Sequence, residues 1–243
     1  MKDYEKLQKL IDESDNIVFF GGAGVSTESG LKDFRGKNGL YKMKQKHKDL
    51  APEYLLSNRC LYDEPEEFFA YYRTYMDIRD IKPNITHEYL AKLEKTGKLK
   101  AVITQNIDGL HQKAGSKNVL EIHGTITKNY CCKCKKIYKS DYVFEVGGVP
   151  RCECGGMVRP DVVLYGEMLP PAFETAMAYI AKADLLIVAG TSLTVEPASS
   201  LVRLFNGKHL VIINNNPTPY DGLAELVINK PLGKIFSKLT INK

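Results

Sequence analysis

No apolar run in this 243-residue sequence is long enough to cross a membrane. The longest, residues 184–190 (DLLIVAG) and 210–213 (LVII), have the length of strands. Residues 1–16 (MKDYEKLQKLIDESDN) are charged, have helical spacing and lack the apolar segment of a signal peptide. The sequence also contains no internal repeat and no low-complexity segment. These absences favour a cytoplasmic protein that does not associate with a membrane.

The composition is that of a globular protein, with 44% hydrophobic and 26% charged residues. The length suits one large domain, or a domain that carries a small insert. The net charge of +5 comes from 34 basic and 29 acidic residues. This excess is too small to indicate nucleic-acid binding by itself, although it suits an acidic cofactor. We therefore expect a monomer without direct contact to nucleic acid.

Short apolar runs alternate with segments of helical periodicity. The runs at 16–21, 100–105, 184–190 and 209–214 are rich in β-branched or aromatic residues and predict buried parallel strands. Helical patterns occupy 66–77, 86–96, 171–181 and 197–205. This alternation predicts an α/β fold with a Rossmann-like doubly wound sheet, whose ligands bind at the carboxyl ends of the strands. We expect the sheet lobe to span about 1–125 and 160–243, interrupted by an insert at about 126–159.

The first predicted strand runs into a glycine-rich segment, residues 21–26 (GGAGVS). Such a turn lets backbone N–H groups approach a pyrophosphate at the start of the next helix. It departs from the G-x-G-x-x-G fingerprint, because Thr27 occupies the third glycine position, and a tight turn without a ligand is the alternative. The following segment, 31–48, resembles a flexible loop. Its Asp33, Phe34 and Arg35 could fold over a ligand, or could belong to an ordinary solvated loop.

Polar side chains follow three of the predicted strands. Gln105, Asn106 and Asp108 end the second strand, where an amide and a carboxylate could hold a ribose or a carboxamide. Asp108 could equally be a helix cap. Gly190, Thr191 and Ser192 follow the third strand, and Asn214 follows the fourth, again with helix capping as the alternative. His123 lies between the polar end of the second strand and the insert. Its pKa range suits a general base, although a single histidine is more often a packing residue.

Five of the six cysteines fall between residues 131 and 154. In a reducing compartment such a cluster indicates metal rather than disulfides. The pairs Cys131-x-x-Cys134 and Cys152-x-Cys154, 17 residues apart, have the pattern of a zinc ribbon with one structural ion. Cys132 could compete with Cys131, but the two-residue gap favours the latter. Four sulfur ligands leave no open position for catalysis.

Taken together, these segments resemble the sirtuin family. The segments that carry the resemblance occur in the order typical of sirtuins, from about residue 16 to 221. They are GAGVSTESGLKDFRG, TQNIDGLH, EIHG, the cysteine pairs, RPDVVLYGE, GTSLTVEPA and IINNNPTPYD. The resemblance implies an NAD-dependent protein-lysine deacetylase, which transfers the acyl group to ADP-ribose and releases nicotinamide and O-acetyl-ADP-ribose. It implies that His123 is the base that removes a proton from the ribose hydroxyls.

The resemblance also assigns the ligand contacts. NAD would be bound by Gly22, Ala23, Gly24, Thr27, Asp33, Phe34, Arg35, Gln105, Asn106, Asp108, Gly190, Thr191, Ser192 and Asn214. Acyl-lysine proteins or peptides would be bound as an added strand by Val163, Tyr165, Gly166, Glu167, Val195 and Glu196.

The expected acyl preference rests on the absence of a Tyr–Arg pair that binds negatively charged acyl groups. Sirtuins that favour malonyl or succinyl groups carry a Tyr and an Arg three residues apart in the helix before the segment PNITH (83–87). Here Ala70 stands three residues before Arg73, so we expect short neutral acyl groups to be preferred. The rival hypotheses are a mono-ADP-ribosyltransferase or NAD glycohydrolase using the same pocket, and a nucleic-acid-binding or scaffolding protein. The last leaves His123 and the polar end of the second strand unexplained.

Overall fold

A computed structural model describes residues 2–32 and 50–242 of the chain. Six parallel strands form the larger sheet, in the order β3-β2-β1-β7-β8-β9. Their bounds are β1 Ile17–Gly21, β2 Leu99–Thr104, β3 Val119–Glu121, β7 Leu185–Ala189, β8 His209–Ile213 and β9 Leu226–Ile228. The doubly wound sheet and its four central strands are thus confirmed, whereas β3 and β9 were not predicted.

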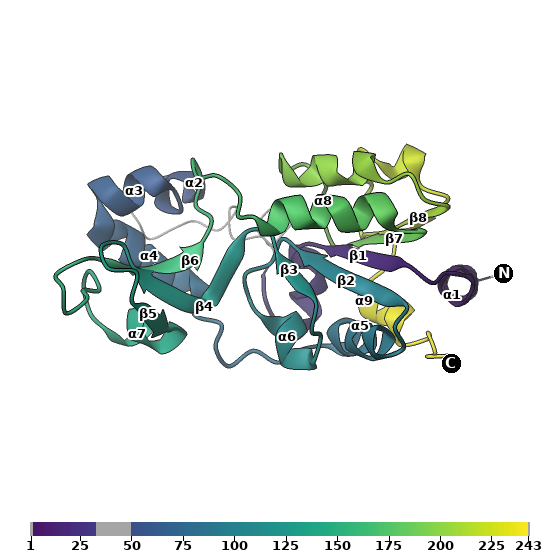
Figure 1. The fold of residues 1–243 in the computed structure, drawn as a ribbon, viewed down its shortest axis with the longest axis horizontal. Coiled ribbons are helices and arrows are strands. Elements are labelled where there is room, and N and C mark those ends of the chain that lie inside the picture. Colours follow the sequence, from purple (N-terminus) through teal and green to yellow (C-terminus); the bar gives the residue numbers. More distant parts are fainter. Residues whose placement is uncertain (1, 33–49, 243) are drawn as a thin grey trace.

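Both faces of this sheet are buried. Along β1, Ile17 and Phe19 join one apolar cluster, and Val18 and Phe20 join another. Figure 1 shows α8 (Ala172–Lys182) on one side of the sheet and α5 (Ile85–Lys95), α6 (Leu110–Ala114) and α9 (Leu232–Phe236) on the other. The predicted helix 197–205 is a 3-10 helix, η4 (Ala198–Leu204). Helix α1 (Asp3–Glu13) and 3-10 helix η5 (Asp221–Leu223) complete this part.

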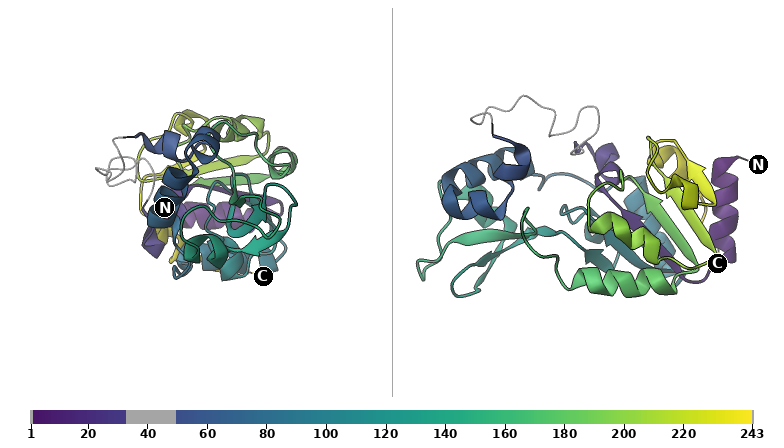
Figure 2. Two further views of the ribbon diagram at one scale, coloured as in Figure 1. Left: turned by 90° about the vertical axis from the view of Figure 1, so that its left-hand side faces the viewer. Right: turned by 90° about the horizontal axis from the view of Figure 1, so that it is seen from above.

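The remaining elements gather at one end of the molecule (Figure 2). Strands β5, β4 and β6 form a three-stranded antiparallel sheet. The bounds are β4 Gly124–Cys131, β5 Ile137–Lys139, β6 Val158–Val162, α2 Pro52–Leu55, α3 Asn58–Asp63, α4 Pro65–Met76 and α7 Ser140–Glu145. A single apolar cluster contains Leu55, Phe68 and Phe69 together with Ile126 and Val158. Helices α2 to α4 therefore pack on the cysteine-bearing segment, a long-range contact that the sequence analysis did not anticipate.

The order of the large sheet positions the ligand site. Strand β1 pairs with β2 on one side and with β7 on the other, so connections leave it in opposite directions. In such a sheet the crevice lies beyond the carboxyl ends of the strands at this reversal. Among the described residues, no helix is both long enough and apolar enough to span a membrane.

Candidate active site

The turn after β1 makes direct backbone contact with the end of β7. Gly24 N–H donates to the Gly190 carbonyl at 2.8 Å, and Gly22 N–H donates to the Ala189 carbonyl at 3.1 Å. A Cβ on Gly24 would lie 2.7 Å from Gly190 Cα, and Gly190 itself has φ +60°, where glycine is favoured. The chain then forms the short 3-10 helices η1 (Ala23–Val25) and η2 (Thr27–Ser29), and Ala23 and Ser26 line the neighbouring cavity. A glycine-rich turn at the start of helical segments is suited to a pyrophosphate.

Ser26 links this turn to the end of β2. Its hydroxyl donates to Asp108 Oδ2 at 2.6 Å and accepts from the Asn106 side-chain amide at 3.0 Å. Burial raises the pKa of Asp108, while the Ser26 hydroxyl and the Leu110 N–H act in the opposite direction. Asp108 Oδ1 also accepts from the Leu110 N–H at 2.9 Å, the first N–H of α6. The N-cap position itself is Gly109, so Asp108, which was considered as the cap from the sequence, lies one residue before it while it holds Ser26. Ser26 is a site residue that the sequence analysis did not select.

His123 follows β3 and is half-buried. Its Nδ1 lies 3.0 Å from the Gln105 carbonyl, which can only accept, so the neutral ring carries its proton on Nδ1 and presents Nε2 as an acceptor. Burial lowers the pKa of His123, and the hydrogen bond to Gln105 partly opposes this. The Gln105 side chain is itself held by Thr191, at 3.0 Å. The imidazole is therefore neutral and oriented at physiological pH, as a general base requires.

A cavity of about 1060 Å³ joins these groups to the small sheet. Its volume is at the upper end of the roughly 300–1,000 Å³ usual for small-molecule sites. Of the predicted residues it is lined by Ala23, Gln105, Asn106, Asp108, His123, Val163, Tyr165, Gly166, Glu167, Val195 and Glu196. The other predicted residues that the structure describes lie outside this lining, on the turns after β1, β7 and β8. They are Gly22, Gly24, Thr27, Gly190, Thr191, Ser192 and Asn214. Asp33, Phe34 and Arg35, with most of the predicted 31–48 loop, fall outside the described residues.

The segment 163–168 crosses between the two parts of the molecule. The Tyr165 N–H donates to the Leu56 carbonyl, and the Tyr165 carbonyl accepts from the Asn58 N–H, both at 3.0 Å. The Glu167 carboxylate accepts four hydrogen bonds within the protein. They come from both Arg159 terminal nitrogens, from the Asn58 amide at 2.8 Å and from the Leu164 N–H at 2.9 Å. This ion pair is largely buried, so the Glu167 side chain fixes the shape of the segment.

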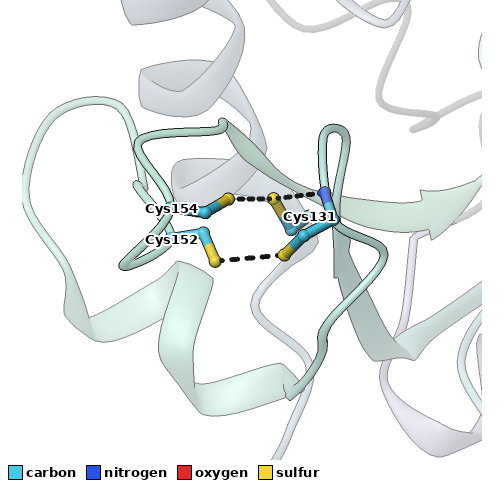
Figure 3. A group of neighbouring side chains, drawn as sticks. Cys131, Cys152 and Cys154 are labelled. Carbon is cyan, nitrogen blue, oxygen red and sulfur yellow. Dashed lines mark hydrogen bonds between the residues drawn. The ribbon is translucent and has the colours of Figure 1, made fainter.

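The four predicted metal ligands come together at the tip of the small sheet. The sulfur atoms of Cys131, Cys134, Cys152 and Cys154 all lie within 4.8 Å of one another. Figure 3 shows the labelled members turned towards each other, and the Cys131–Cys154 and Cys134–Cys152 sulfur pairs are each 3.5 Å apart. Tetrahedral zinc with bonds of about 2.3 Å needs sulfurs about 3.8 Å apart, so the geometry fits one zinc ion. Cys132 is outside the group, and its sulfur accepts a 4.0 Å contact from Tyr62.

The chain has a doubly wound sheet with a crevice for a nucleotide at the carboxyl ends of its strands, and a small sheet whose four cysteines fit a zinc ion. These features define a class of nucleotide-binding α/β proteins. The Sir2 family model matches residues 22–197, and the chain belongs to this family. A curated NAD-dependent protein deacetylase of Clostridium perfringens is 52% identical over 237 residues, covering 96% of this chain and 97% of the relative.

Two solved structures are similar over nearly the whole chain. A Sir2 variant with a deacetylated p53 peptide and 3′-O-acetyl ADP-ribose has 38% identity and a TM-score of 0.89, covering 97% of this chain and 96% of that one. Sir2Tm bound to a propionylated peptide has 38% identity and a TM-score of 0.85, with 98% and 97% covered.

Proposed function

We propose that this protein is an NAD-dependent protein-lysine deacetylase that passes the acyl group of lysine to ADP-ribose, with release of nicotinamide and O-acetyl-ADP-ribose. The observation that carries the proposal is His123, a neutral histidine whose Nε2 is free to accept a proton in a cavity shared by the cofactor turn and segment 163–168. The deacetylase relatives and the ligands of the similar structures support the same reaction.

Each part of the site has a task in this reaction. Bound NAD supplies a ribose carbon that becomes electrophilic as nicotinamide leaves. Ser26, Asn106 and Asp108 hold the nicotinamide end, and Ala23 and Gln105 bind the pyrophosphate and nicotinamide ribose. The sirtuin resemblance assigns Asp33, Phe34 and Arg35, which lie outside the described residues, to the same ligand groups. The phosphates and the adenosine ribose are held by the residues on the turns after β1, β7 and β8, which are Gly22, Gly24, Thr27, Gly190, Thr191, Ser192 and Asn214. His123 Nε2 accepts the proton of a ribose hydroxyl.

The acylated substrate binds between segment 163–168 and residues Val195 and Glu196. Main-chain hydrogen bonds to an added strand give affinity with little dependence on sequence. Because the Glu167 carboxylate is taken up by Arg159, Asn58 and Leu164, Glu167 acts by shaping this segment. The zinc ion supports the sheet that carries Arg159, since Tyr130 and Cys131 on β4 pair with Arg159 and Val158 on β6.

The function is tested with an acetyl-lysine peptide and the purified protein. We expect mass spectrometry to show loss of the acetyl group only when NAD is present, with one O-acetyl-ADP-ribose formed for each lysine released. Deacetylation that proceeds equally without NAD contradicts the proposal.

We further propose a preference for short neutral acyl groups over succinyl and malonyl. Arg73 is the only cationic residue of α4, and its guanidinium is held by the Val143 carbonyl at 2.8 Å and the Gly148 carbonyl at 2.5 Å. The cavity lining includes apolar side chains such as Ile107, Ile126 and Leu164, and among the described residues it contains no arginine and a single lysine, Lys32, shortly after η2. A carboxylate placed there without a partner loses its hydration at a cost of several kcal/mol.

We therefore expect kcat/KM for a succinyl-lysine peptide to be at least about 100-fold below that for the acetyl peptide of the same sequence. A propionyl peptide, which has no charge, should remain within about tenfold of acetyl. Comparable turnover of the succinyl and acetyl peptides would contradict the proposed acyl preference without affecting the proposed reaction.

A further inference from the structure

Asn84 connects the start of α5 to the cofactor turn, although 53 residues separate it from Gly30 at the end of that turn. Its side-chain amide nitrogen donates one hydrogen to the Val25 carbonyl at 2.8 Å and the other to Ser29 Oγ at 3.0 Å. Val25 ends η1 and Ser29 ends η2. One side chain therefore ties together the ends of both short helices.

The amide cannot rotate away, because Asn84 is also the cap of α5. Its Oδ1 accepts from the Thr86 N–H at 3.0 Å, and the Asn84 N–H donates to His87 Nδ1 at 3.2 Å. Both polar atoms of the side chain, Oδ1 and Nδ2, are thus in use, and the reciprocal cap fixes the residue to the start of α5.

A neighbouring element holds Ser26, which lies between η1 and η2. Ser26 is bound by Asp108, which also accepts from the first N–H of α6, and α6 packs on α5 through His87 and His111, whose ring centroids are 4.6 Å apart. Both histidines are buried, and their rings contact edge to face. The turn is consequently held at Val25, Ser26 and Ser29 by residues at the starts of two helices that pack on each other.

We propose that Asn84 is a positioning residue for the dinucleotide: it holds the η1–η2 turn in the shape that binds the nucleotide, without touching the nucleotide itself. The inference rests on the proposed function in that the ligand is NAD. Among the described residues, the hydrogen bonds of Asn84 go to the cofactor turn and to the start of α5, and none goes to segment 163–168 or the zinc cysteines. Its replacement should therefore affect nucleotide binding and spare the peptide.

The test is Asn84→Asp. Aspartate caps a helix as well as asparagine does, so α5 keeps its start. Its second oxygen, however, faces the Val25 carbonyl, which leaves two acceptors opposed where a donor stood. We expect the Kd of ADP-ribose, measured by isothermal titration calorimetry, and the KM of NAD to rise about tenfold or more, while the KM of the acetyl peptide stays within about twofold.

Asn118→Asp is the matched control. Asn118 also donates through its amide to a backbone carbonyl, that of Lys100, but at the opposite end of β2 from the site. It should leave both affinities unchanged. Ser29→Ala, which removes one of the two acceptors, should weaken ADP-ribose binding by about twofold to fivefold and gives a second readout if Asn84→Asp fails to fold.

Two results overturn the inference: ADP-ribose affinity that is unchanged in Asn84→Asp and Ser29→Ala, or equal losses of peptide and nucleotide affinity accompanied by a fall in Tm. The proposed function fails separately. If wild-type protein binds ADP-ribose and Asn84→Asp does not, while neither deacetylates a peptide, the positioning role stands and the reaction does not.

Discussion

Replacing His123 with alanine should lower kcat for deacetylation of an acetyl-lysine peptide by about 10²- to 10⁴-fold, the usual contribution of a general base. The variant removes Nε2, the acceptor that the Gln105 hydrogen bond leaves free. It removes no residue of the cofactor turn, so ADP-ribose affinity and Tm should stay close to wild type. His209→Ala is the control, because His209, at the start of β8, hydrogen-bonds with Glu225 and is absent from the cavity lining. Retained activity in His123→Ala would assign the base to another residue.

The pH profile supplies an independent test of the same base. Burial lowers the pKa of His123 below its usual value of about 6.5. The base acts in its neutral form, so kcat/KM should be constant at neutral pH and fall only as the pH drops through this lowered value. A profile that already loses activity above about pH 7 would contradict this assignment.

Loss of the metal should unfold the small sheet while the large sheet remains. Structural zinc contributes about 10–16 kcal/mol in small zinc-dependent units. The small sheet also shares its apolar cluster with α2 to α4, so these helices should loosen with it. After chelation, hydrogen exchange should accelerate in β4, β6 and α4, while β1 and β7 stay protected, because their clusters contain no cysteine.

Two cysteine variants provide the matched comparison. Cys152→Ser removes a ligand and should abolish stoichiometric zinc, whereas Cys132→Ser changes the adjacent, non-clustered thiol and should keep one zinc per chain. Equal zinc content in the two variants, or full protection of β4 after chelation, would contradict a structural role for the metal.

The sequence predicts the central sheet because β1 and β7 are buried at every position, and β2 and β8 are buried at every position except Lys100 and His209. Strands β3 and β9 have only three residues each, too short for any periodicity to appear. The helical pattern at 197–205 predicts a helix but not its 3-10 form. The packing of α2 to α4 against the cysteine segment depends on contacts between residues more than 50 positions apart, which no local pattern reveals.

Some residues of the site can likewise be predicted from the sequence, and others cannot. Residues that follow strands, such as Gln105, Gly190 and Asn214, can be located because parallel strands end at one edge of the sheet. The zinc cysteines follow from their spacing. By contrast, the Ser26–Asp108 bond and the Asn84 amide join separate segments through short polar side chains. Glu167 was predicted to bind substrate as part of an added strand, and only the structure shows the donors to its carboxylate, Arg159 and Asn58 among them.

The proposed reaction is tested most directly by the release of nicotinamide from NAD with and without an acetyl-lysine peptide. A deacetylase needs the acyl oxygen to displace nicotinamide, so release should depend strongly on the peptide and equal the amount of lysine deacetylated. Nicotinamide release at the same rate without the peptide would instead indicate an NAD glycohydrolase, and would contradict the function proposed for His123 and its cavity.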